Sequence, residues 1–192
     1  MDMQIHDILS KIYSMPEDSV QKLVAKMKKC SFVKGDRILQ AGKVERNIFF
    51  VEKGIVRAYL PLDGKDVTFW VGMEGATVVS LKSYVCNEPG YETVECVEDA
   101  VVYVLQREVL DELFGQDIHI ANWGRRFAEN EFLQTEEKFL PLLFTNATQR
   151  YEMLLKRQLY LLQCISLEHL ASYLGITPVS LSRIRAAVAG KR

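Results

Sequence analysis

The spacing of apolar residues changes several times along the chain. In the first 30 residues, apolar side chains recur at helical intervals on both sides of Pro16, which predicts two short helices. From Phe32 to Leu105 the pattern changes to short β-rich runs separated by glycine-containing turns. These runs are residues 37–39, 48–51, 55–60, 67–71, 93–97 and 100–105. Many short strands at near-regular spacing predict a rolled or closed antiparallel sheet.

Helical spacing returns after the strands, first over residues 107–114 and then over a long segment, residues 116–140. A helix of about 25 residues spans roughly 37 Å, which is too long for burial inside a domain of this size. The long helix is therefore predicted to pack on its own sheet or to pair with the same helix of a second subunit, and we favour the homodimer. The residues expected at the dimer interface are Ile120, Trp123, Phe127, Asn130 and Gln134.

Three further helical segments follow Pro141, and the last two match a helix-turn-helix. The segments cover residues 148–160, 167–174 and 178–188. Ala171 is small enough for two helices to cross closely, and Gly175 suits a turn that needs a left-handed backbone. Thr177 and Pro178 suit the start of the second helix. The positions expected to be buried are Leu170, Leu174, Ile176, Leu181 and Ile184.

The second helix of such a motif enters the major groove of DNA, with its first residues near the base edges. Arg183 is the predicted base-reading residue, because a guanidinium can donate to both O6 and N7 of guanine. Val179 suits a thymine methyl group, and the hydroxyls suit phosphate contacts. The predicted DNA-binding set is Thr177, Val179, Ser180, Ser182, Arg183 and Arg185. Those expected only to neutralise phosphates are Arg150, Lys156, Lys191 and Arg192.

The net charge of −1 hides a division along the chain. Residues 145–192 contain seven basic and two acidic residues, a balance of 7 − 2 = +5. The remaining residues contain 17 basic and 23 acidic side chains, a balance of −6. A basic C-terminal end indicates a polyanionic partner there, in agreement with the helix-turn-helix.

Several stretches together resemble the Crp/Fnr family of bacterial regulators. They read FVKGD at residues 32–36, IFFVEKGIVR at 48–57, DGK at 63–65, LASYLGIT at 170–177 and LSRI at 181–184. The resemblance implies an α+β fold, with an N-terminal antiparallel β-roll (a double-stranded β-helix of the cyclic-nucleotide-binding type) and flanking helices. A long dimerisation helix and a C-terminal all-α helix-turn-helix domain follow. The corresponding domains are residues 1–115, 116–141 and 142–192.

The resemblance also implies function: a homodimeric, sequence-specific transcription regulator with double-stranded DNA as its partner. It allows RNA polymerase and a small-molecule effector as further partners. The acidic base-reading residue usual in the family is absent from residues 178–180, so a different target sequence is expected. Only residues 186–192 follow Arg185, so a shortened or missing wing is expected as well.

The residues that bind a cyclic phosphate in this family have no counterpart here. Cyclic-nucleotide binders carry a cassette of roughly Gly-Glu-Leu, followed by Pro-Arg-Ser-Ala-Thr. The corresponding stretches are Val79-Ser80-Leu81 and Pro89-Gly90-Tyr91-Glu92-Thr93. With Gly90 at the arginine position and Glu92 nearby, an anionic phosphate would meet no cation. We therefore expect no useful affinity for cyclic AMP, and no cofactor.

Two alternatives remain for the interior of the roll. Either the interior is filled by side chains, such as those of Tyr84, Tyr91 and their neighbours, or it binds an effector other than cyclic AMP. The candidate walls of such an effector pocket are Val78, Val79, Ser80, Leu81, Lys82, Ser83, Tyr91, Glu92, Thr93, Trp123 and Phe127.

Other classes of function find little support in the sequence. No histidine falls among the strands, no GxSxG, P-loop or HExxH motif occurs, and the four cysteines lack CxxC spacing. We therefore expect no enzyme activity, no catalytic residues and no metal site, in a cytoplasmic protein without a transmembrane helix. The main alternative is a β-roll regulatory protein that senses another small molecule, or a haem or redox signal, with DNA binding secondary.

Overall fold

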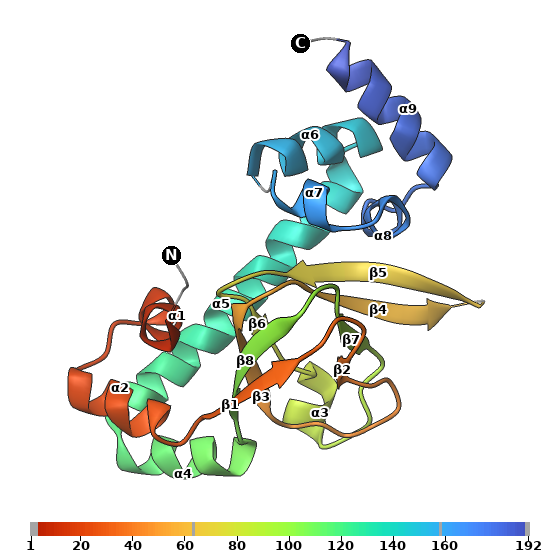
Figure 1. Cartoon of the computed structure of the whole chain (residues 1–192). Helices are drawn as coiled ribbons and strands as arrows, with labels where there is room; N and C mark the ends of the chain where they lie inside the picture. Colours follow the sequence, from red (N-terminus) through yellow and green to blue (C-terminus); the bar gives the residue numbers. More distant parts are fainter. Residues whose placement is uncertain (1–3, 63, 158, 191–192) are drawn as a thin grey trace. The chain divides into compact units, whose positions relative to one another are not determined.

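The computed structural model describes residues 4–62, 64–157 and 159–190. In chain order the helices are α1 (Ile5–Ile12), α2 (Glu17–Val24), α3 (Leu81–Cys86), α4 (Arg107–Gln116), α5 (Ile118–Phe144), α6 (Ala147–Arg157), α7 (Leu161–Cys164), α8 (Leu167–Tyr173) and α9 (Pro178–Ala189). The strands are β1 (Lys28–Phe32), β2 (Arg37–Leu39), β3 (Ile48–Lys53), β4 (Val56–Leu62), β5 (Lys65–Gly72), β6 (Thr77–Val78), β7 (Thr93–Cys96) and β8 (Ala100–Leu105). The predicted α+β class is confirmed (Figure 1).

The strands form two four-stranded sheets, with the orders β1-β8-β3-β6 and β2-β7-β4-β5. Neighbours in each sheet come from distant parts of the chain, and strand β8 lies between β1 and β3 in antiparallel pairing. Val102 of β8 lies opposite Cys30 on one side and Val51 on the other. This interleaving of early and late strands confirms the predicted antiparallel roll.

Three local predictions were wrong. Residues 28–30 were predicted to be helical but start strand β1, because pairing with β8 overrides the weak helical pattern. Helix α4 continues through Gly115, where a break was expected. Helix α5 continues through Pro141 for one more turn to Phe144, since a proline so near the end of a helix costs few backbone hydrogen bonds. The Pro141 carbonyl accepts hydrogen bonds from the Thr145 backbone (3.0 Å) and hydroxyl (2.6 Å).

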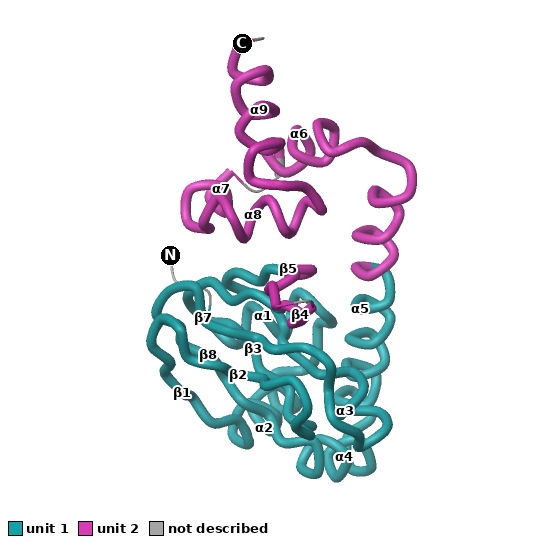
Figure 2. Tube along the Cα trace, turned by 90° about the vertical axis from the view of Figure 1, so that its right-hand side faces the viewer, with its two compact units in different colours: residues 1–58, 71–133 teal, residues 59–70, 134–192 magenta. Residues whose placement is uncertain are grey.

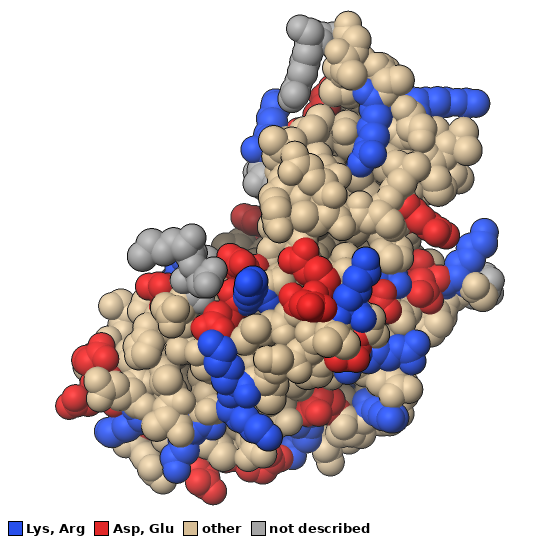
Figure 3. Space-filling model, in the orientation of Figure 1, with Lys and Arg blue, Asp and Glu red and all other residues tan. Residues whose placement is uncertain are grey.

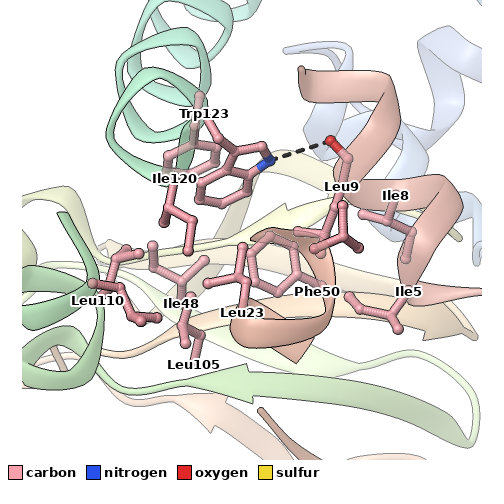
Figure 4. Close-up of a cluster of buried hydrophobic side chains, with 13 residues drawn as sticks. Ile5, Ile8, Leu9, Leu23, Ile48, Phe50, Leu105, Leu110, Ile120 and Trp123 are labelled. Carbon is pink, nitrogen blue, oxygen red and sulfur yellow. Dashed lines mark hydrogen bonds between the residues drawn. The ribbon is translucent and has the colours of Figure 1, made fainter. Parts of the chain in front are cut away.

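A core cluster of buried apolar side chains joins α1, α2, α4 and the first half of α5 to the β1-β8-β3-β6 sheet. Trp123 of α5 is completely buried, and its indole donates a hydrogen bond to the Leu9 carbonyl at 3.2 Å (Figure 4). Its ring stacks on Phe127, with centroids 5.6 Å apart, and lies 6.0 Å from the Phe50 ring of β3. These contacts fix which side of α5 faces the sheet.

The chain divides into two compact units (Figure 2). The first contains residues 1–58 and 71–133, and the second contains residues 59–70 and 134–192. The boundary runs through α5 and assigns parts of β4 and β5 to the second unit, whereas the sequence placed domain boundaries at the ends of the long helix. None of the described helices is long and apolar enough to cross a membrane.

Asp117 joins α2 to the start of α5. Its nearly buried carboxylate accepts hydrogen bonds from the Ser19 hydroxyl (3.0 Å), the Lys22 ammonium (3.2 Å) and the backbone amides of His119 (3.0 Å) and Ile120 (3.4 Å). Burial by itself raises the pKa of Asp117, but these hydrogen bonds outweigh burial and lower the pKa below its ordinary value. The ionised carboxylate therefore stabilises the folded state.

Replacing Asp117 by asparagine is expected to lower the free energy of unfolding by about 1–3 kcal/mol at neutral pH, because the ion pair and amide contacts weaken. The pKa of Asp117 is lowered on folding, so its contribution is complete above the unfolded-state pKa of about 3.9 and is lost as the pH falls through the folded-state value. Urea titrations of wild type and D117N at about pH 7 and about pH 3 measure this difference.

Glu108→Gln is the matched control, because it removes an exposed carboxylate that pairs with Arg46 on the surface of the same unit. It should change the stability by at most about 1 kcal/mol at neutral pH. If Asp117→Asn lowers the free energy of unfolding by the same amount at both pH values, the assigned role of the carboxylate is contradicted.

Candidate DNA-binding site

Helices α8 and α9 are joined by a turn centred on Gly175. The backbone of Gly175 is left-handed, with φ of +68°, as predicted. Its amide donates to the Ser172 carbonyl at 2.9 Å, and the Ile176 amide donates to the Ala171 carbonyl at 3.0 Å. This pair of bonds forms a Schellman motif, which satisfies the last carbonyls of α8 and reverses the chain. Gly175 is therefore required by its backbone conformation.

The second helix starts at the predicted residues. The hydroxyl of Thr177 accepts a hydrogen bond from the Ser180 amide at 3.2 Å, and Pro178 occupies the first helical position. Leu170, Ala171, Leu174 and Leu181 are buried between the helices. Ile176 and Ile184 were also expected to be buried but are only half-buried.

Arg183 lies on the exposed face of α9. It forms no hydrogen bond or ion pair with any other residue that the structure describes, so its guanidinium is available to a ligand. Val179 precedes it by one helical turn and is 62% exposed. Together they present one cation and one branched apolar group on the same face.

The hydroxyls of this segment are less free than the sequence suggested. The Ser182 hydroxyl donates to the Pro178 carbonyl at 3.0 Å, and the hydroxyls of Thr177 and Ser180 lie 3.0 Å apart within hydrogen-bonding distance. Thr177 and Ser182 are exposed, whereas Ser180 is half-buried. A phosphate contact by Ser182 would therefore compete with a bond inside the helix.

The other predicted cations have different environments. Arg185 is half-buried, and its Nε atom is buried without a hydrogen-bond partner among the described residues. Arg150 donates to the backbone carbonyls of Thr145 (2.6 Å) and Leu174 (3.0 Å), so its expected role as a phosphate neutraliser is replaced by a structural one. Lys156 of α6 is exposed, and Lys191 and Arg192 lie outside the described residues. On the C-terminal unit, the face in Figure 3 carries Lys and Arg side chains projecting from a mostly uncharged surface.

The predicted effector pocket is divided between the interior and the surface of the first unit. Leu81, Lys82 and Tyr91 are exposed, and Lys82 pairs with Glu88 at 3.2 Å, so these three residues do not line an interior pocket. Val79 is half-buried, and the buried members are Val78, Ser80, Ser83, Glu92 and Thr93. Trp123 and Phe127 are packed in the core, and Tyr91 does not fill the roll.

An arginine in place of Gly90, as in cyclic-nucleotide binders, would require its neighbours to move. A Cβ atom at this position would collide with the Ser80 hydroxyl and lie 3.3 Å from the Glu92 carboxylate. Ser80 and Ser83 are hydrogen-bonded to each other at 3.2 Å, and Ser83 donates to the Glu88 carbonyl at 2.8 Å. The loop is therefore closed around a buried carboxylate and two hydroxyls that already have partners.

Three of the predicted dimer residues are not available to a second subunit. Ile120 and Trp123 are fully buried, and Phe127 is 7% exposed, in contacts with the chain's own core. Asn130 is half-buried and Gln134 is exposed. The interface prediction was wrong for the three apolar residues because both possible partners of α5, the sheet and a second helix, select the same apolar pattern.

The sequence analysis missed a coherent apolar face further along α5. Two rows repeat at i, i+7 and i+11, and all six side chains are 42–78% exposed. The first row is Phe132, Phe139 and Leu143, and the second is Leu133, Leu140 and Phe144. At 3.6 residues per turn the first row lies on the side of the helix opposite Trp123, and the second row lies next to it on one flank of the helix. The repeat was visible in the sequence, but it required the helix to extend beyond Pro141.

The described residues offer no site for metal chemistry. Within them, no group of three or more His, Cys, Asp or Glu side chains is placed to hold a metal ion.

Cys96 is buried, and burial raises the pKa of its thiol to about 11, so it stays protonated and unreactive near neutral pH.

Comparisons with known proteins agree with this architecture. The family model for the Cyclic nucleotide-binding domain matches residues 29–117. No curated protein matches the sequence. Among solved structures, FixK2 from Bradyrhizobium japonicum is 20% identical with a TM-score of 0.71, covering 86% of this chain and 85% of that one.

Two further structures extend the similarity over more of the chain. A CooA mutant from Carboxydothermus hydrogenoformans is 17% identical with a TM-score of 0.67, covering 98% of this chain and 87% of that one. The Thermus thermophilus Catabolite Activator Protein is 20% identical with a TM-score of 0.59, covering 96% and 87%. Residues 29–117 therefore match the cyclic nucleotide-binding domain family, and the chain as a whole has the fold of the Crp/Fnr regulators that its sequence resembles.

Proposed function

We propose that this protein is a homodimeric, sequence-specific DNA-binding transcription regulator that does not respond to cyclic AMP. The observation that carries the proposal is the exposed guanidinium of Arg183, on the second helix of a closely packed helix-turn-helix. A guanidinium with no partner in the protein can donate two hydrogen bonds to one guanine in the major groove. The neighbouring Val179 offers an apolar contact for a thymine methyl group.

Selection of bound sites from random DNA, followed by electrophoretic shift assays at fixed salt, tests this function. A dimer should recover inverted half-sites about one helical turn, roughly 34–36 Å, apart. Arg183→Ala should weaken binding to the selected site by about 1–3 kcal/mol and relax the preference at one base pair in each half-site.

Lys156→Ala is the matched control, since Lys156 is an exposed cation of the same unit outside the recognition helix. It should weaken selected and unrelated DNA alike, if it changes affinity at all. If both variants lose affinity equally for every sequence, Arg183 does not read a base.

Dimerisation is supported by the six-residue apolar face of α5 defined above. Exposed apolar side chains arranged in two adjacent rows on one helix are typical of a surface that packs against another helix. In the first half of α5 the side that carries Trp123 is packed in the core of the first unit, whereas the six apolar residues further along the helix are exposed, so they form the surface that a second copy can cover. We therefore place the dimer contact at residues 132–144.

Leu140→Glu should weaken the dimer by about 3 kcal/mol or more, roughly a hundredfold, because each interface would bury two carboxylates in place of two apolar groups. Analytical ultracentrifugation should show a shift from twice the chain mass of 22.0 kDa to the single mass. Val33→Glu places the same charge on a 62% exposed apolar residue of the β-roll and should leave the mass unchanged. A wild-type protein that sediments as a monomer at every concentration would contradict the proposed dimer.

The absence of a cyclic AMP response is proposed from the closed loop around Gly90. An anionic phosphate there would lie against the buried Glu92 carboxylate, and Gly90 supplies no cation at the position where cyclic-nucleotide binders have an arginine. Isothermal titration calorimetry should detect no saturable binding of cyclic AMP to wild type. The Glu92→Gln variant should also fail to bind cyclic AMP, since it removes the repulsion between carboxylate and phosphate but does not supply a cation. Micromolar affinity in either protein would refute this part of the proposal.

A further inference from the structure

The C-terminal unit contains a cavity of about 300 Å³ that was not predicted from the sequence. Its walls come from strand β5, the second half of α5, helix α6 and the end of α8. Strand β5 is tied to α8 beside it: the Thr68 amide donates to the Ser172 hydroxyl at 2.8 Å, and that hydroxyl lies 3.4 Å from the Asp66 carbonyl. The volume is at the lower end of the range for small-molecule sites, roughly 300–1,000 Å³.

The charged groups of the cavity favour an anion. Lys138 and Arg150 line it together with a single carboxylate, Glu137, which leaves a balance of 2 − 1 = +1. Lys138 also lies over the ring of Trp70, with its ammonium 5.2 Å from the centroid. A ligand with one negative charge would make the site neutral.

Arg150 supplies a specific unsatisfied donor. Its two terminal nitrogens donate to the Thr145 and Leu174 carbonyls, which hold the guanidinium in place. The remaining Nε–H is buried and has no acceptor among the described residues. Buried donors of this kind are rare in folded proteins, and an acceptor on a ligand would satisfy it.

Apart from Gln134 and the Tyr173 hydroxyl, the rest of the lining is apolar. Phe69 and Tyr173 contribute aromatic rings, and Met153 and its aliphatic neighbours complete the wall. Burial raises the pKa of Tyr173, so its hydroxyl remains a neutral hydrogen-bond donor near neutral pH. An apolar wall with a few polar groups at fixed positions is the usual composition of a small-molecule site.

We propose that this cavity binds a small monocarboxylate with an apolar body. A carboxylate oxygen accepts the hydrogen bond of Arg150 Nε, Lys138 supplies the second positive charge, and the apolar body lies against Phe69, Tyr173 and Met153. The site is separate from the phosphate cassette of the β-roll and does not depend on DNA binding. It lies against α8, the first helix of the helix-turn-helix, so a ligand there contacts the unit that carries Arg183.

Phenylacetate and octanoate are suitable probes, with phenylacetamide and octanamide as their uncharged counterparts. The binding of each to the full chain, without DNA, is measured by calorimetry and by shifts of backbone amide resonances in ¹⁵N-labelled protein. At least one acid should bind saturably, at least about tenfold more tightly than its amide, because only the acid forms a charge-assisted bond. The shifted amides should include those of Lys138, Arg150 and Tyr173.

Two variants test the assignment of the site. Met153→Trp should abolish binding by filling the cavity. Arg150→Lys should weaken the binding of the acid by at least about tenfold and leave the binding of the amide unchanged, because lysine retains the charge but has no Nε–H donor. Arg125→Lys, the same substitution at an exposed position of α5 outside the cavity, should have no effect.

Three outcomes would overturn the proposal. The first is that neither acid binds saturably at millimolar concentration. The second is that acid and amide bind equally well. The third is that the shifted amides lie outside the second unit. This measurement uses the wild-type protein, so it does not depend on whether a variant folds. Failure of DNA binding alone would leave the cavity proposal standing, because none of these measurements involves DNA.

Discussion

The burial of Trp123 is the contact on which the arrangement of α5 depends. Its indole is inaccessible to solvent, hydrogen-bonded to the Leu9 carbonyl, stacked on Phe127 and packed near Phe50. A helix held in this way cannot rotate without exposing a large aromatic surface. The side of α5 that faces its own sheet is thereby fixed, and the two exposed apolar rows further along the helix, which lie outside this contact, are the ones that we propose for a partner.

The helix-turn-helix depends on a different, local constraint. The Schellman bonds at Gly175, the cap at Thr177 and the buried Ala171 set the geometry of α8 and α9 within a short stretch of sequence. Each of these devices acts over a few residues, so the orientation of Arg183 relative to α8 does not require the rest of the chain. The part of the protein assigned to DNA is therefore defined independently of the β-roll.

The β-roll has the fold of cyclic nucleotide-binding domains, while the segment that corresponds to their phosphate cassette contains a glycine and a carboxylate in place of a cation. Gly90 packs so closely against Ser80 that a side chain there would displace the Ser80 hydroxyl, and Glu92 places a carboxylate beside it. In the C-terminal unit the predominant charge is positive, because Arg150 and Lys138 line a cavity together with one carboxylate. The charged groups at these two places are thus of opposite predominant sign.

The sequence by itself determined the features that depend on local spacing: the antiparallel strands, the helix-turn-helix with its left-handed Gly175, the exposed recognition face around Arg183, and the missing cassette arginine. It could not determine which side of α5 packs on the sheet, because the stripe of Ile120, Trp123 and Phe127 is equally suited to a core or a dimer. It also gave no indication that Arg150 would bind two carbonyls and line a cavity, since its partners Thr145 and Leu174 meet only after folding. Contacts between distant segments decide such roles, and a periodic pattern records only that a residue is apolar or charged.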